Sequence, residues 1–260
     1  MQHSSLPRPA GRVPLPSRVP VLPGLDIDAQ YRQTRMGGDF FDLVLTPGHV
    51  VFLLTDIAGQ RDQTHHIAAE VQDVFRAMAE DLLTDPDRNE NDALVAILHE
   101  INRALLAASQ GVRCATTFIA TYNRLSGIFS YINAGGPPAL LRVDGQIEKL
   151  ESNGLPLGLF THLTHDAAFT VLNPGSTLLL VSKGVVEAHH HHEEFGLERV
   201  HHLLHTSDHP NAHALGSSVL QAAGQWIDGP SYFGPRLTIP GFRAGNNEQD
   251  MTTVVITRQS

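Results

Sequence analysis

The sequence predicts an α+β fold, in which two mainly antiparallel sheets form a sandwich flanked by helices. Three observations support this prediction: short apolar runs typical of buried strands, two long helical patterns after the first such run, and a later block of alternating residues with turn signals. The order is strands, two helices, many strands, helices and a last strand. Since helices and strands are segregated, antiparallel pairing is favoured over parallel βαβ units.

The first predicted strand and the two long helices lie in the N-terminal half of the chain. Residues 50–55 form a continuous apolar run rich in strand formers, which predicts a buried strand that ends at Asp56. Apolar residues then recur at helical spacing over residues 64–83 and again over residues 91–108. We therefore expect two long helices directly after the strand.

The C-terminal half changes from an alternating pattern to mixed elements. Residues 115–150 alternate between polar and apolar side chains, with turn signals at Ser126-Gly127 and Asp144-Gly145, and so predict an antiparallel meander. The later elements that the patterns predict are a buried strand over 176–182, helices over 195–205 and 211–226, and a last strand over 252–257.

The first 24 residues differ in composition from the rest of the chain. Six of the sixteen prolines lie there, and such a stretch can neither form a helix nor pair as a central strand. We expect residues 1–24 to be an extended arm on the domain or a linker. Residues 25–260 are then expected to form one domain, a size close to the upper limit for a single core.

Composition excludes several classes of protein. The 18 basic and 27 acidic residues give a net charge of −9, which offers no attraction to nucleic acid or anionic lipid. The single cysteine, Cys114, excludes an intrachain disulfide, and its neighbours indicate a packing role. No apolar run reaches the roughly 20 residues of a membrane span. We expect a cytoplasmic protein without membrane or nucleic-acid partners.

Two segments have no assigned role. The tract His189–His192 is interpreted as a solvated loop, with a zinc or nickel site as the alternative, since adjacent residues on one loop rarely converge on a metal. Residues 229–247 are rich in proline and glycine and are expected to form a long loop that could cover the neighbouring site.

Six short motifs occur in a fixed order along the chain. They are Met36-Gly37-Gly38-Asp39-Phe40-Phe41-Asp42, Thr55-Asp56-Ile57-Ala58-Gly59, Asn133-Ala134-Gly135 with Pro137-Pro138, Gly154-Leu155-Pro156-Leu157-Gly158, Gly184-Val185-Val186-Glu187-Ala188, and Asp250-Met251-Thr252. In this order the set resembles the SpoIIE-type bacterial branch of the PPM-type, protein phosphatase 2C-like serine/threonine phosphatases. The resemblance covers nearly the whole chain and implies an α-β-β-α sandwich.

The resemblance also implies a chemistry. The family hydrolyses phosphoserine and phosphothreonine with two Mg or Mn ions, which require several oxygen ligands to balance their charge. Asp39 and Asp56 match carboxylates of that centre, and the carbonyl of Ile57 matches a backbone ligand. Asp39 and Asp56 could instead be a turn residue and a strand-end cap.

Four positions depart from the family pattern, and all are expected at the same centre. Lys183 stands where the family has an aspartate, and Gln249 replaces the first residue of an Asp-Asp pair. Gln60 and Gly136 replace two histidines. A shift of one residue would let Asp250 replace the ligand lost at Gln249.

Three functions remain open on this reading. The first is a pseudophosphatase, in which Lys183 neutralises Asp39 and Asp56, Mn or Mg binds weakly or not at all, and the domain binds a phosphoprotein such as an anti-sigma-factor antagonist. The second is an active phosphatase with one metal on Asp39, Asp56 and Asp250, in which Lys183 grips the substrate phosphate. The third is a regulatory or scaffolding module whose two long helices respond to a sensor partner. As an alternative to a role in the site, Lys183 could simply point into solvent from the end of a strand.

Overall fold

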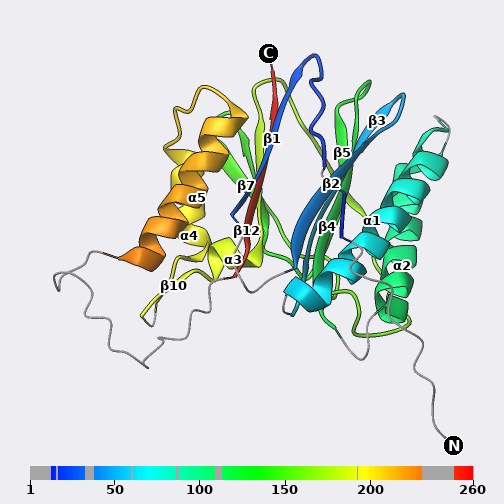
Figure 1. The fold of residues 1–260 in the computed structure, drawn as a ribbon. Helices are drawn as coiled ribbons and strands as arrows, with labels where there is room; N and C mark the ends of the chain where they lie inside the picture. The colour runs from blue at the N-terminus through cyan, green and yellow to red at the C-terminus, as the bar shows by residue number, and fades with distance from the viewer. Residues whose placement is uncertain are drawn as a thin grey trace, which may run out of the picture.

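The computed structural model describes residues 13–15, 17–32, 38–59, 61–85, 88–108, 113–191, 193–229 and 249–259, without the side chains of residues 61 and 62. Two five-stranded sheets pack face to face, and helices cover their outer faces (Figure 1). Every pairing between named strands is antiparallel. The predicted α+β sandwich is confirmed.

Each sheet combines segments that are distant in the sequence. The first has the order β1-β12-β9-β6-β7, and the second has the order β2-β3-β4-β5-β8. Their bounds are β1 Leu25–Arg32, β12 Met251–Arg258, β9 Thr177–Val181, β6 Ala139–Val143 and β7 Gln146–Leu150, then β2 Asp39–Leu45, β3 His49–Ile57, β4 Ala115–Asn123, β5 Ile128–Ala134 and β8 Ala168–Val171.

Helices on the two outer faces complete the four layers (Figure 1). The pair α1 and α2 packs on the second sheet, and the pair α4 and α5 packs on the first. Their bounds, with those of a short helix and a small hairpin, are α1 Arg61–Leu83, α2 Glu90–Ala108, α3 Lys183–Val186, β10 His189–His190, β11 Glu193–Glu194, α4 Gly196–His205 and α5 Ala212–Asp228.

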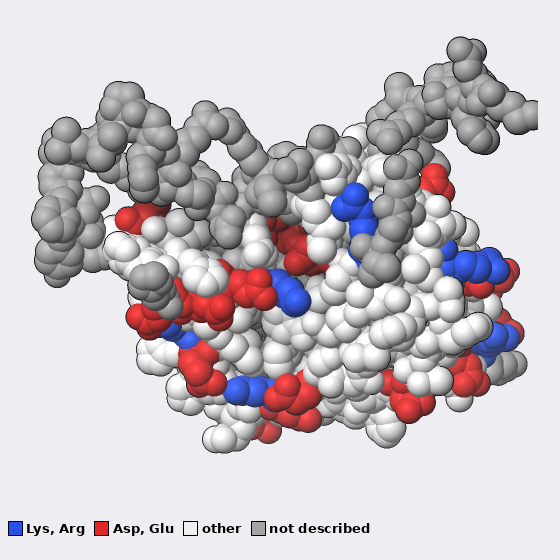
Figure 2. Space-filling model, turned by 90° about the horizontal axis from the view of Figure 1, so that it is seen from below, with Lys and Arg blue, Asp and Glu red and all other residues white. Residues whose placement is uncertain are grey.

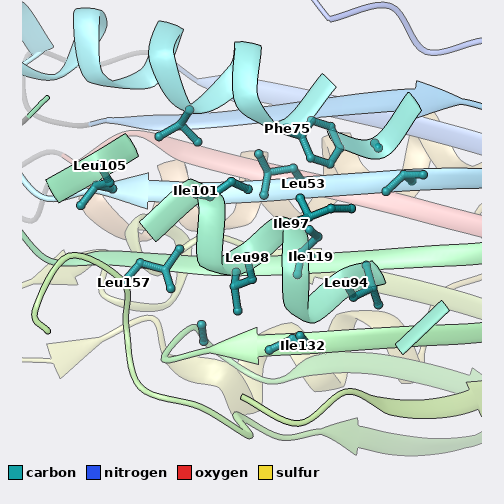
Figure 3. Close-up of a cluster of buried hydrophobic side chains, with 14 of the residues drawn as sticks. Leu53, Phe75, Leu94, Ile97, Leu98, Ile101, Leu105, Ile119, Ile132 and Leu157 are labelled. Atoms are coloured by element: carbon teal, nitrogen blue, oxygen red, sulfur yellow. The ribbon is translucent and has the colours of Figure 1, made fainter. Parts of the chain in front are cut away.

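Three apolar cores hold the four layers together. One lies between the sheets, and the other two lie between each sheet and its helices. Figure 3 shows the core under α1 and α2, where Leu53, Ile119 and Ile132 from the strands meet Phe75 and Ile97 from the helices. These five side chains are at most 1% exposed, so they fix the helices on the sheet.

The structure differs from the sequence prediction in several elements. Strand β3 continues through Asp56 to Ile57, because Asp56 pairs with Asp39 across the sheet instead of ending the strand. The expected loop at the histidine tract is a small hairpin, β10-β11, and His192 lies outside the described residues. Strands β1, β2 and β8 and helix α3 were not predicted, since their patterns are short or only partly buried. Most of the proline-rich 229–247 segment lies outside the described residues.

No helix in the described parts of the chain is long and apolar enough to cross a membrane.

Candidate active site at the ends of the two sheets

Two aspartates face each other at one end of the second sheet. Asp39 begins β2 and is in register with Asp56 near the end of β3. Asp39 is only 8% exposed, and Asp56 is half-buried. A residue larger than glycine would not fit at position 38, because a Cβ atom there would collide with the carbonyl oxygen of Ile57. The glycine therefore lets the two strand ends approach closely.

A third carboxylate comes from the other sheet. Asp250 lies directly before β12 and is 1% exposed. The hydroxyl of Tyr31 donates a hydrogen bond of 2.7 Å to Oδ2 of Asp250, and the hydroxyl of Thr252 donates one of 2.9 Å to Oδ2 of Asp39. The structure thus brings together Asp39 and Asp56, the two carboxylates that the family resemblance implies, and Asp250, the replacement that a one-residue shift would allow.

The three carboxylates line a cavity of ≈ 250 Å³. Lys183, Glu187 and Gln249 line it as well. Figure 2, a view of this end of the molecule, shows acidic atoms gathered on the surface with basic atoms beside them. The other residues that line the cavity are Ala58, Gly59, Cys114 and Thr116.

Lys183 places a positive charge inside this cavity. It begins α3, and Ser182, in an extended conformation, links it to the end of β9. Lys183 is half-buried, and its charge acts on Asp56. The alternative that Lys183 points away into solvent is therefore wrong. Gly184, the next residue, must be small because a Cβ there would collide with the Asp250 carbonyl oxygen.

Burial dominates the electrostatics of the paired aspartates. Burial raises the pKa of Asp39 well above its usual value, and the charge of Asp56 raises it further. The pKa of Asp56 is also raised by burial, while Lys183 opposes that rise. The two carboxyls therefore resist ionising together, and Lys183 is the group whose charge favours ionisation of Asp56.

Gln249 and Glu187 form a second polar pair at the cavity. Gln249 is exposed, and its Nε2 lies 3.3 Å from Oε2 of Glu187. Glu187 belongs to one of the six sequence motifs, but it is not among the predicted site residues. Its position four residues after Lys183, across one turn of α3, is the signal that could have identified it.

The remaining predicted positions contribute less to the cavity. Gly136 lines a neighbouring pocket that shares Asp56 and Thr116 with this cavity, and its amide donates a 2.9 Å hydrogen bond to Oδ1 of Asn133. Gln60 lies outside the described residues. Cys114, expected to have a packing role, is half-buried at the cavity, and burial raises the pKa of its thiol.

Several features of the cavity oppose the binding of two divalent cations. Oδ2 of Asp250 already accepts from Tyr31, Oδ2 of Asp39 accepts from Thr252, and Lys183 adds a positive charge. In the described ranges, no group of three or more His, Cys, Asp or Glu side chains has the arrangement of a metal site. The same holds at the histidine tract, where His190 instead packs against Trp226 with ring centroids 6.0 Å apart.

The four layers and the cavity lined by carboxylates agree with the resemblance to the PPM-type phosphatases. The sequence profile described as Stage II sporulation protein E (SpoIIE) matches residues 46–259. The chain therefore belongs to the SpoIIE family.

Solved structures agree on the fold. The RsbU and RsbW domains of a Mycobacterium tuberculosis protein are 22% identical over 92% of this chain and 61% of that one, with a TM-score of 0.70. The phosphatase domain and regulatory fragment of Bacillus subtilis SpoIIE are 18% identical over 90% of this chain and 63% of that one, with a TM-score of 0.64. RsbX in complex with magnesium is 13% identical over 89% of this chain and 94% of that one, with a TM-score of 0.56. This chain thus spans less than two thirds of the first two relatives.

Proposed function

We propose that this SpoIIE-family domain is a pseudophosphatase that acts in bacterial phospho-signalling by binding a protein partner. The observation that carries the proposal is the position of Lys183 in the cavity of Asp39, Asp56 and Asp250. In this proposal the ammonium group supplies internally the positive charge that metal ions supply in active relatives.

Charge repulsion between Lys183 and a metal ion is the physical argument against metal binding in this cavity. A unit charge about 5 Å from a dication costs on the order of 6 to 7 kcal/mol at an effective dielectric of about 20. A second loss adds to this, since Gln249 offers no negative charge and its amide faces Glu187. Metal binding would have to overcome both effects, so Mn or Mg binds weakly or not at all in this proposal.

The competing function is an active phosphatase with a rebuilt site. The observation in its favour is that Asp250, held by Tyr31, stands in the same cavity as Asp39 and Asp56. Asp39, Asp56 and Asp250 would hold a single Mn or Mg, which would activate water for attack on a phosphate ester. Lys183 would then bind the phosphate as a point charge.

The proposed partner is a phosphoprotein or a protein similar to an anti-sigma-factor antagonist. Support comes from the family and from the Mycobacterium tuberculosis relative, whose RsbU domain occurs together with an RsbW domain. A domain that binds such a partner without hydrolysing it would act by occupancy. Helices α1 and α2 would be the elements through which a sensor could act on it.

Calorimetry with Mn and Mg, combined with release of phosphate from a generic phosphate ester, tests the proposal. A pseudophosphatase gives neither binding heat nor turnover at neutral pH. Micromolar Mn binding with turnover that Asp56→Ala abolishes would establish the active enzyme instead. Asp81→Ala, an exposed aspartate on α1, is the matched control.

A further inference from the structure

The N-terminal arm is bound to α1 by a paired amide contact. The backbone amide of Leu15 donates to Oε1 of Gln72 at 2.7 Å, and Nε2 of Gln72 donates to the carbonyl oxygen of Leu15 at 2.9 Å. Gln72 is only 2% exposed. One buried side chain therefore satisfies both backbone groups of an arm residue, as a neighbouring strand would.

A second contact binds the arm to β2. The hydroxyl oxygen of Ser17 lies 2.6 Å from the carbonyl oxygen of Phe41 and 2.8 Å from Oδ1 of Asp42. Asp42 is 1% exposed and is held by two hydrogen bonds from Arg76 of α1, at 2.7 and 3.0 Å. The groups that receive the arm are therefore fixed by the domain itself.

The outer part of the arm, residues 13–15, buries little apolar surface, whereas Leu22 further along is buried between the sheets. The side chains of Val13 and Leu15 are 54% and 60% exposed. A cavity of ≈ 290 Å³ remains between the arm, α1 and β2, and its lining includes Phe40, Ala68 and Asp39. Leu15 and Ser17 thus have polar partners while space remains beside their side chains, and this space and the carboxylate cavity share Asp39.

We propose that this α1–β2 face is a peptide-docking groove, which the arm fills in cis and an extended segment of a protein partner fills in its place. The fitting segment has an apolar residue with free backbone amide and carbonyl groups two positions before a serine. The arm itself demonstrates that chemistry, and a larger apolar side chain would fill the remaining space. The inference rests on the proposed function, because it locates the surface where a partner binds.

The test uses the full chain and a fluorescent peptide that copies residues 11–22. In the variant Leu15→Pro/Ser17→Ala the arm loses the backbone amide that donates a hydrogen bond to Gln72 and the hydroxyl that contacts Asp42. The intact arm competes at an effective concentration of about 1 mM. For an arm whose own dissociation constant is about 0.1 mM, this variant should therefore bind the peptide roughly tenfold more tightly than the natural chain. Fluorescence anisotropy measures both affinities, and circular dichroism checks folding.

Two controls locate the binding in the groove. Gln72→Ala in the same background should abolish binding, whereas Gln146→Ala, an exposed glutamine on β7, should leave it unchanged. A peptide that carries Leu15→Pro should not bind, which tests the amide contact without altering the protein. Absence of binding to the arm variant, or equal binding by both peptides, would overturn the proposal. Neither result depends on the metal titration, so the two proposals can fail separately.

Discussion

Two buried aspartates on strand β2 have opposite environments. Asp42 faces α1, where Arg76 and Ser17 contact its carboxylate. Asp39, three residues earlier, faces the other side of the strand, toward Asp56 and Asp250, and its pKa is raised well above the usual value by burial and by Asp56.

The difference separates structure from function along one strand. A carboxylate that is paired and hydrogen-bonded contributes to a specific fold once it is buried, whereas carboxylates that face one another are costly and mark a site. Asp42 therefore belongs to the framework that holds α1. Asp39 belongs to the candidate site, and Lys183, in the same cavity, reduces the electrostatic cost of burying carboxylates that face one another.

The largest expected effect comes from removing the paired carboxylate. Asp42→Ala removes the buried carboxylate that accepts from Arg76, and the guanidinium left behind is partly exposed, so we expect the free energy of unfolding to fall by about 1 to 3 kcal/mol. Urea denaturation measures the change. Asp81→Ala on the exposed face of α1 is the control and should change stability by less than about 0.5 kcal/mol. A loss below about 1 kcal/mol at Asp42 would show that the contrast with Asp39 is unfounded.

A smaller effect of opposite sign is expected at Asp39. Asp39→Asn removes one of the facing charges and keeps an acceptor for Thr252, so stability at neutral pH should rise by about 1 kcal/mol. The folded pKa of Asp39 lies above its unfolded value of about 3.9, so the folded state favours the protonated carboxyl. The stability that protonation confers is present below the unfolded pKa and is lost as pH rises through the folded pKa.

The gain from Asp39→Asn should therefore be seen above the folded pKa and vanish below about pH 4. Thermal unfolding of both proteins from about pH 3 to about pH 8 measures how the gain in stability changes with pH. A variant less stable than the natural chain at neutral pH would contradict this account of the site.

The smallest effect uses the single cysteine as a reporter of the cavity. Burial raises the pKa of Cys114, the Lys183 charge lowers it, and the Asp56 charge raises it. Since the thiolate is the reactive form, Lys183→Gln should slow alkylation by iodoacetamide by roughly a factor of a few at pH 8, and Asp56→Asn should accelerate it. Equal rates in all three proteins would place the lysine charge elsewhere.

Much of the fold was predictable from local patterns. The helical stripes of α1 and α2 and the apolar run of β3 are long and regular, and both give their elements within a few residues. Strand β8 was missed because only four residues pair, and two of them are exposed. The histidine hairpin was missed because its packing against Trp226 depends on a residue far away in the sequence.

The site was predictable only in part. The family resemblance pointed to Asp39 and Asp56, to Lys183 as a departure, and to Asp250 only through a one-residue shift. The structure places all four around one cavity. Tyr31 could not be given its contact with Asp250 from the sequence, since 219 residues separate the two. The arm contact at Gln72 was hidden for the same reason, because a glutamine within an amphipathic helix has no signature of its own.

Restoring the missing carboxylates is the most direct test of the central claim that Lys183 stands in for metal. Mn should be titrated by calorimetry into the natural chain and into the double variant Lys183→Asp/Gln249→Asp under identical conditions. The account predicts little or no heat from the natural chain and clear binding by the double variant. Equal Mn affinity in the two proteins would contradict it, because the lysine would then have no part in excluding the metal.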